Sequence, residues 1–186
     1  MKVKAKVTVT PEGVVVGTEK VHLEATGSEL LVEVYRKMVG DYPKFFKMDP
    51  LSRLGFVASE LLLAQENPRR TDCEDRAVIL FNRSASLADD VLYQKTIRNE
   101  EVEFYPSPAV FVYTLPNIVT GEIAIRNKYY GETSFYVFED KDDSWMDIVD
   151  QAFQDPVTRS AVAGWLECPD PEHFEAELYL DRKSVV

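Results

Sequence analysis

The N-terminal residues alternate between apolar and polar side chains, which is typical of a strand at a solvent boundary. From residue 2 to residue 10 every second side chain is apolar, and lysines and threonines occupy the positions between. This period of two predicts a half-buried strand. A Pro-Glu-Gly turn follows, and apolar runs at 14–17 and 21–23 predict further short strands. We therefore expect an N-terminal β-hairpin or meander over residues 1–25.

Two stretches repeat apolar side chains with the period of an amphipathic helix. The first runs from 29 to 39, with Ser28 as the expected N-cap and Gly40 at the end. The second begins after Asp49, also an expected N-cap, with Pro50 at the first helical position, where no amide hydrogen is needed. Each helix is expected to bury one face.

The middle of the chain predicts a strand and a helix in succession. Residues 76–82 form a short apolar run, and a serine-rich turn leads into a helical pattern at 84–97. This β-α order indicates an α/β layered fold. Two later runs rich in β-branched and aromatic residues, 109–115 and 134–138, predict buried strands, and a short helix is expected within 118–128.

Three more elements and two glycines complete the pattern. Residues 144–154 repeat apolar side chains at helical spacing, 160–168 predicts a buried strand, and 174–180 alternates like a half-exposed final strand. Gly121 and Gly131 are expected where a close backbone approach or a positive φ excludes a side chain. No linker divides these elements, so we expect one domain over residues 1–186.

Composition limits the classes of partner. A chain of 186 residues is long enough to bury a core without a metal or a disulfide. Its 32 acidic and 21 basic residues give a formal charge of −11, which would repel a nucleic-acid backbone. Cys73 and Cys168 are far apart, and neither an export signal nor an apolar run long enough to span a membrane is present. We expect a reduced, cytoplasmic protein without membrane insertion or bound nucleic acid.

The order of four segments resembles the N-terminal half of the β-ketoacyl-acyl carrier protein synthases, also called 3-oxoacyl-acyl carrier protein synthases. The segments are a helix at 49–63, the strand at 77–81, the helix and strand within 115–137, and a later strand at 162–167. The resemblance covers about 50–168. It implies the thiolase-like fold, an α/β architecture with a mixed central β-sheet and helices packed on it, of which this chain would be one half.

The position of the catalytic cysteine departs from that family. In active synthases the strand before this position delivers a cysteine to a helix N-terminus, where the dipole and backbone amides favour a thiolate and an oxyanion. Counted from Gly131 at the family's spacing, the nucleophile position falls on Asp140. Glu139, Asp142 and Asp143 place further negative charge there. Condensation by the usual route is therefore not expected.

The resemblance also implies an interface. In the family the strand before the nucleophile pairs across a two-fold axis, which assigns a dimer interface to Ser134, Phe135, Tyr136, Val137 and Phe138. The two catalytic histidines and the lysine of the family belong to a C-terminal half that this chain is too short to contain. We expect the face left by that half to be exposed and to carry a large apolar patch.

These observations favour a catalytically silent synthase-like subunit. It would assist a condensing enzyme in fatty-acid, polyketide or pigment biosynthesis, as a homodimer or in a hetero-complex with a ketoacyl synthase. Two alternatives remain open. Carboxylates near Asp140 would hydrolyse or decarboxylate an acyl thioester if an apolar cleft raised a carboxylate pKa. Alternatively, the chain would bind an acyl carrier protein through a basic patch, for which Arg69 with Arg70, or Arg126 with Lys128, are the available clusters.

Other reactive side chains are interpreted as structural. His22 and His173 lie outside the matched segments and are expected to be ordinary, partly exposed histidines. Cys73 sits in a polar loop and Cys168 at a strand end, so neither is expected to be a nucleophile. The aspartates between 140 and 143 lack the glycine and glutamate of a calcium loop, so a solvated helix cap explains them better than a metal. No cofactor and no metal are expected.

Overall fold

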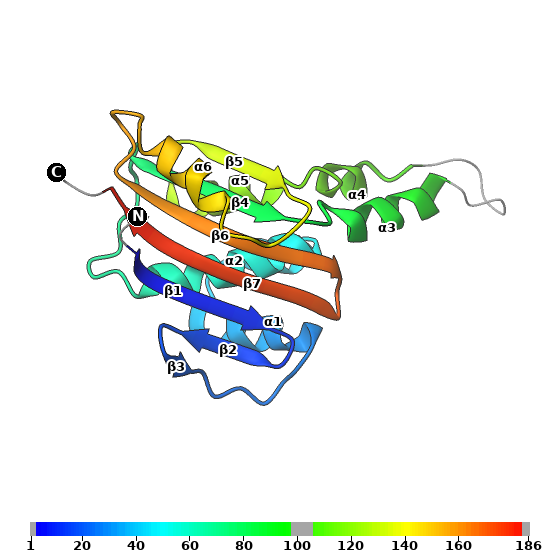
Figure 1. Cartoon of the computed structure of the whole chain (residues 1–186). Coiled ribbons are helices and arrows are strands. Elements are labelled where there is room, and N and C mark those ends of the chain that lie inside the picture. The colour runs from blue at the N-terminus through cyan, green and yellow to red at the C-terminus, as the bar shows by residue number, and fades with distance from the viewer. Residues whose placement is uncertain (1–2, 98–105, 184–186) are drawn as a thin grey trace.

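The computed structural model describes residues 3–97 and 106–183, which form one mixed seven-stranded sheet with helices on both faces (Figure 1). The strands are β1 (Val3–Thr10), β2 (Gly13–Val16), β3 (Glu19–Lys20), β4 (Arg76–Asn82), β5 (Thr133–Val137), β6 (Ser160–Asp170) and β7 (His173–Arg182). Their order across the sheet is β3-β2-β1-β7-β6-β4-β5. β4 runs parallel to β5 and β6, whereas β7 is antiparallel to β1 and β6. The expected mixed sheet with packed helices is confirmed.

The first N-terminal strand follows the alternation in the sequence, but the strand expected at 21–23 is wrong, because the third strand is β3 at Glu19–Lys20. β1 and β2 form an antiparallel ladder that sets Val7 opposite Val16, and β3 extends it. Val7 and Val9 are fully buried in the core, while the alternating residues Lys6 and Thr8 are only partly buried, as a period of two requires. Lys2, the first residue of the expected strand, lies outside the described residues.

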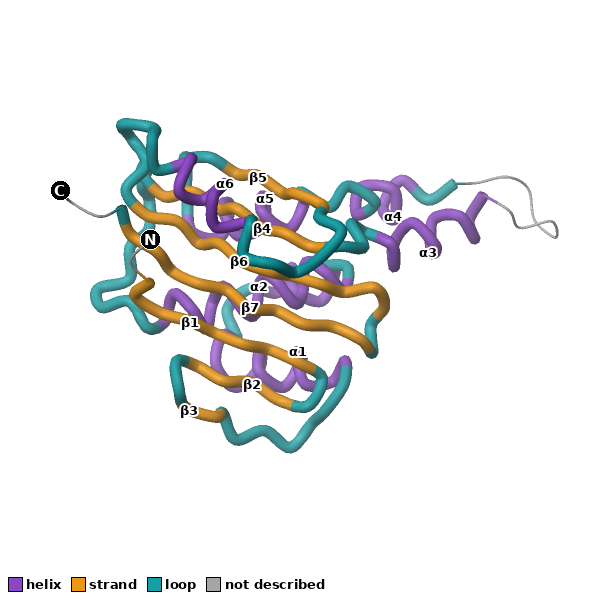
Figure 2. Tube along the Cα trace, viewed as in Figure 1, coloured by secondary structure: helices purple, strands orange, loops and turns teal. Residues whose placement is uncertain are grey.

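Helices cover the two faces of the sheet unequally (Figure 2). They are α1 (Ser28–Val34), the π-helical turn η1 (Tyr35–Val39), the 3-10 turn η2 (Pro43–Lys47), α2 (Pro50–Ala64), α3 (Leu87–Ile97), α4 (Pro108–Tyr113), α5 (Ile118–Asn127) and α6 (Trp145–Ala152). One face carries the main core, to which α1, α2 and α5 contribute Leu30, Phe56 and Ile123. On the opposite face α6 covers a smaller core, where Trp145 packs against Phe81 and Tyr179.

The expected strand at 109–115 is wrong, because the segment from 108 to 113 is helix α4. Ser107 accepts a hydrogen bond from the amide of Val110 at 3.4 Å, and Pro108 occupies the first turn. A serine cap followed by proline is a helix-start signal. Here that signal outweighs the strand preference of the valines and aromatic residues that follow.

Two smaller expectations also need correction. Gly27 takes the cap position of α1, and Ser28 is its first helical residue. Gly121 in α5 has open space around it, so no close approach requires a glycine there. Gly131 does lie in a close approach, because a Cβ at this position would stand 2.5 Å from the carbonyl oxygen of Arg76. The backbone of the turn before β5 is therefore packed directly against β4.

Candidate functional site

The loop between β5 and α6 contains the four acids of the expected nucleophile position, and all four are exposed. The carboxylate of Asp142 accepts hydrogen bonds from the amide and hydroxyl groups of Ser144, the residue before α6. These bonds lower the pKa of Asp142. Because Glu139, Asp140 and Asp143 are also exposed, no apolar cleft encloses them. The thioester-cleaving alternative requires such a cleft with a raised carboxylate pKa, and this loop does not provide it.

Lys141 attaches this loop to the sheet. Its Nζ lies 2.5 Å from Oε1 of Glu175 and 2.8 Å from Oε2 of Glu177, and Glu177 also pairs with Lys6 and accepts a hydrogen bond from Tyr179. Burial raises the pKa of Glu177, but the hydrogen bonds from these three donors outweigh burial and lower it to about 2. The part of the sheet beside α6 is therefore charged. The large apolar patch expected on an exposed face is not found there.

β5 contains four of the five residues of the expected dimer interface and is an edge strand, and Phe138 directly follows it. Among the strands that the structure describes, β5 pairs with β4 alone. Phe135 packs against the main core, Tyr136 stacks on Phe81 with ring centroids 5.4 Å apart, and Val137 is 53% exposed. A cavity of about 310 Å³ lies between β5 and α6, with Tyr136 and Ile148 in its lining. The outer edge of β5 is left unpaired by the strands that the structure describes.

Exposed apolar side chains gather on α3 and α4, which extend beyond the sheet (Figure 1). Six large apolar side chains on or beside these helices are between 45% and 48% exposed: Leu87, Val91, Leu92, Phe111, Val112 and Leu115. We call this set the α3–α4 surface. Phe111 contacts Tyr93 across the two helices, with ring centroids 5.4 Å apart. Sequence reasoning missed this surface because it placed 109–115 in a buried strand.

The cysteines and histidines of the described chain are not arranged as catalytic groups. Cys168 is buried and Cys73 is half-buried, and burial raises the pKa of both thiols. His22 and His173 are exposed, and Nδ1 of His173 lies 2.9 Å from a carboxylate oxygen of Asp170. Because the pKa of each cysteine thiol is raised, both thiols stay protonated at neutral pH, which is unfavourable for nucleophilic attack.

The basic clusters considered for carrier binding are paired with acids of the same chain. The pairs are Arg69 with Glu60 at 2.5 Å, Arg70 with Asp75 at 2.5 Å, Arg126 with Asp41 at 2.6 Å, and Lys128 with Asp72 at 3.7 Å. A docking acid would have to replace these internal partners. These clusters are therefore not a free basic patch.

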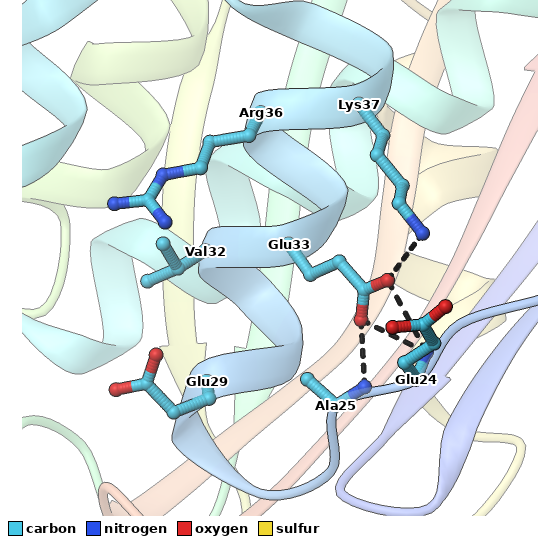
Figure 3. A pocket seen from close by; sticks show the side chains of 7 residues that line it. All are labelled: Glu24, Ala25, Glu29, Val32, Glu33, Arg36 and Lys37. Atoms are coloured by element: carbon cyan, nitrogen blue, oxygen red, sulfur yellow. Dashed lines mark hydrogen bonds and ion pairs between the residues drawn. The ribbon is translucent and has the colours of Figure 1, made fainter.

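A cavity of about 430 Å³ lies against α1 and η1 (Figure 3). The Glu33 carboxylate accepts hydrogen bonds from the amides of Glu24 and Ala25 and pairs with Lys37. Lys37, the amide of Ala25 and the amide of Glu24 together lower the pKa of Glu33 to about 2. The polar groups of this cavity thus hold the loop before α1 in place.

Over residues 3–97 and 106–183, no group of three or more His, Cys, Asp and Glu side chains is arranged to hold a metal ion. In the same ranges, none of the helices has the length and apolar character that crossing a membrane requires.

Comparison with known proteins identifies the fold. No protein-family model and no curated protein matches the sequence. The ishigamide ketosynthase/chain length factor superposes on it with a TM-score of 0.69 and 16% identity, over 98% of this chain and 62% of that chain. A complex of a ketosynthase (ApeO) with its chain length factor (ApeC) from Xenorhabdus doucetiae gives a TM-score of 0.60 and 13% identity, over 99% and 80%.

A third structure extends the comparison. It contains a type II polyketide synthase acyl-carrier protein in complex with its ketosynthase bound to the hexaketide (AntDE:AntF), with a TM-score of 0.62 and 14% identity, over 98% of this chain and 62% of that chain. The chain thus spans less than two thirds of the length of two of these structures. Its fold is the thiolase-like fold of ketosynthases and chain length factors.

Proposed function

We propose that the chain is a non-condensing partner subunit of a ketosynthase, in an assembly that builds a polyketide or a related fatty-acid or pigment chain. The observation that carries this proposal is the exposed acidic loop at the point where active synthases place their cysteine. That placement rests on the spacing counted from Gly131, and the fold similarity over nearly the whole chain supports it. The chain has this fold, but its loop has no cysteine nucleophile. A role in assembling a complex therefore explains the chain better than a catalytic role does.

The chemistry of the loop supports the absence of condensation. A synthase must stabilise an oxyanion beside its nucleophile, and preorganised donors do so only where positive potential is available. Glu139, Asp140 and Asp143 add negative charge at this position, and the amide of Ser144 is already bonded to Asp142. Lys141, the nearby cation in the loop, is paired with Glu175 and Glu177. The loop therefore has no cysteine nucleophile, and the ammonium group of Lys141 and the amide of Ser144 are already engaged by acids of the same chain.

The edge of β5 and the α3–α4 surface support a protein partner. An unpaired edge strand is a template for another strand. A group of half-exposed apolar side chains on a soluble protein usually marks an interaction site. In this proposal the partner strand pairs along residues 134–138, and the α3–α4 surface adds apolar contact. A second copy of this chain or a ketosynthase fits the edge, and the named chain length factor complexes favour the ketosynthase.

Intact-mass and native-mass measurements on the full chain test the proposal. The chain is incubated with malonyl- and acyl-loaded acyl carrier protein, and a purified type II ketosynthase is added for the native measurement. We expect no covalent acyl adduct, no thioester turnover, and a native mass of two chains or a hetero-complex at micromolar concentration. An acyl adduct, turnover, or a strictly monomeric chain with the ketosynthase present would overturn the proposal.

A further inference from the structure

Two carboxyl groups that are far apart in the sequence meet in the interior. Asp89, in the first turn of α3, is 4% exposed, and Asp49, the N-cap of α2, is 8% exposed. The two carboxyl groups lie close enough to shift each other's pKa, and one can hydrogen-bond the other if it carries a proton. Asp49 also accepts hydrogen bonds from the amides of Leu51 and Ser52, at 3.0 Å and 3.2 Å. A hydrogen bond between two carboxyl groups requires a proton on one of them.

The groups around this pair supply no compensating positive side chain. Ionisable side chains near the pair include Asp90 of α3, Tyr113 of α4 and Cys168 of β6. Lys44 of η2 lies near Tyr113, but its ammonium group is paired with Glu122 of α5, at 2.5 Å. Glu167, at the end of β6, is engaged by the amide of Arg83 and the hydroxyl of Ser84. Among the described residues, no ion pair reaches either aspartate. Two buried carboxylates in contact cannot both be charged without large cost, so the pair holds one proton.

The backbone amides at the start of α2 determine which of the two carboxyl groups carries the proton. The first-turn amides and the positive end of the α2 dipole favour a charged carboxylate at Asp49. The proton therefore resides on Asp89, whose hydroxyl donates to Asp49. Burial, followed by the charge of Asp49, raises the pKa of Asp89 to about 8. Oδ2 of Asp89 is buried and accepts no hydrogen bond from a described donor, so the neighbouring carboxyl group of Asp49 is what can compensate the burial of this side chain.

The pair lies where α3 joins the rest of the molecule. Ser86 donates to the carbonyl oxygen of Thr114 at 2.6 Å, and Ser84 donates to Glu167. Beyond this base, α3 is largely exposed and carries half of the α3–α4 surface. Of these polar contacts, the one between Asp49 and Asp89 depends on a proton that mildly alkaline solution removes.

We propose that the proton shared by Asp49 and Asp89 is a pH-sensitive fastening, which holds the first turn of α3 against α2 and releases α3 when the proton is lost. The sign follows from linkage. A carboxyl group that keeps its proton in the closed state but loses it in the open state favours opening as pH rises. The population of the open state therefore rises about tenfold per pH unit up to a pH near 8, and then levels off. The fastening does not depend on the proposed function, although its effect on a partner at the α3–α4 surface does.

Hydrogen exchange of the full chain, without any partner, measures this opening. Peptides covering α3 are followed by mass spectrometry from about pH 6 to about pH 9, and each rate is divided by the intrinsic rate of the unstructured peptide. In the wild-type chain we expect the tenfold rise per unit and the plateau. Asp89→Asn donates an amide hydrogen to Asp49 without titrating, so its profile should be flat. Asp90→Asn changes the exposed neighbour and should keep the wild-type profile.

A second variant keeps the test decisive if Asp89→Asn does not fold. Asp49→Asn retains an N-cap and donates to Asp89, which allows Asp89 to ionise earlier, so the plateau should begin at lower pH. A flat wild-type profile, an unchanged slope in Asp89→Asn, or loss of the slope in Asp90→Asn would overturn the proposal. So would equal protection of α3 and of the core strand β6, because the opening would then be global. None of these outcomes bears on whether the chain binds a ketosynthase.

Discussion

Arg76 and Glu66 form a bidentate ion pair in the interior, with Nη2 2.8 Å from Oε1 and Nη1 3.0 Å from Oε2. The Arg76 side chain is fully buried, and Glu66 is 5% exposed. The pair connects the first residue of β4 to the loop after α2. Because the guanidinium also donates to Ser160 of β6 and to Tyr129, it links the sheet to the helical layer.

Removing the acid of this pair should strongly destabilise the fold. Glu66→Gln leaves Arg76 buried without its counter-charge, which costs about 3–5 kcal/mol. Chemical denaturation monitored by circular dichroism measures the change. Arg182→Gln is the control, because Arg182 contacts the same carboxylate at 3.0 Å but is 45% exposed, and an exposed pair contributes about 0–1 kcal/mol. Equal losses in both variants would contradict this account.

The same carboxylate predicts the response to acid. Burial raises the pKa of Glu66, but hydrogen bonds from Arg76, the amide of Arg70 and Arg182 outweigh it and lower the pKa from 4.5 to about 2. A depressed pKa contributes stability that is present above 4.5 and is lost as pH falls towards 2. We expect the denaturation midpoint to fall in that interval, with a shallower fall in Glu66→Gln. Parallel profiles would exclude this carboxylate as a source of the acid sensitivity.

Two glycine substitutions should have opposite effects. Gly164 in β6 has a φ of +145°, and a Cβ there would lie 2.2 Å from the carbonyl oxygen of Glu177 in β7. Gly164→Ala should therefore separate these strands and destabilise the chain by about 1–3 kcal/mol. Gly121 lies within α5 and has open space around its Cβ position, so Gly121→Ala should stabilise the chain by about 0.5–1 kcal/mol. Thermal unfolding of the two variants compares them directly, and a stable Gly164→Ala would refute the close approach.

A charge on the edge strand should prevent assembly through β5. Val137 and Val157 are both 53% exposed, but Val157 lies outside the strands of the sheet. Val137→Lys places an ammonium group beside the unpaired edge, and lysine on an edge strand discourages pairing. We expect the native mass to shift to a single chain for Val137→Lys and to remain unchanged for Val157→Lys. A dimer or hetero-complex that survives the first change would move the interface elsewhere.

A charge on the α3–α4 surface tests the apolar contact separately. Val112→Asp replaces a 45% exposed side chain of α4, and Ile125→Asp replaces a 66% exposed side chain of α5 as the control. Burying the new carboxylate in an interface carries a desolvation cost, so the first variant should weaken binding to a ketosynthase about tenfold or more. Unfolding midpoints should stay near that of the wild type for both. If Ile125→Asp weakens binding equally, the α3–α4 surface is not the contact.

The sequence predicts elements whose signals are local and fails for contacts between distant segments. Asp49 followed by Pro50 marks the start of α2, and the structure has the expected cap. The start of α4 carries a similar signal in Ser107 and Pro108, but the valines after it suggested a strand. The contact between Asp49 and Asp89 depends on where the first turn of α3 lies relative to the N-cap of α2. No spacing or motif reports that arrangement.

The charged part of the sheet beside α6 also limits how an assembly can grow. A second layer stacked there would have to remove water from Lys6, Lys141 and Glu177, and withdrawing ions from water costs several kcal/mol for each of them. The free edge of β5 carries no such penalty. In the proposed assembly, a partner would therefore add to the edge of the sheet at β5 and would not stack on the face beside α6.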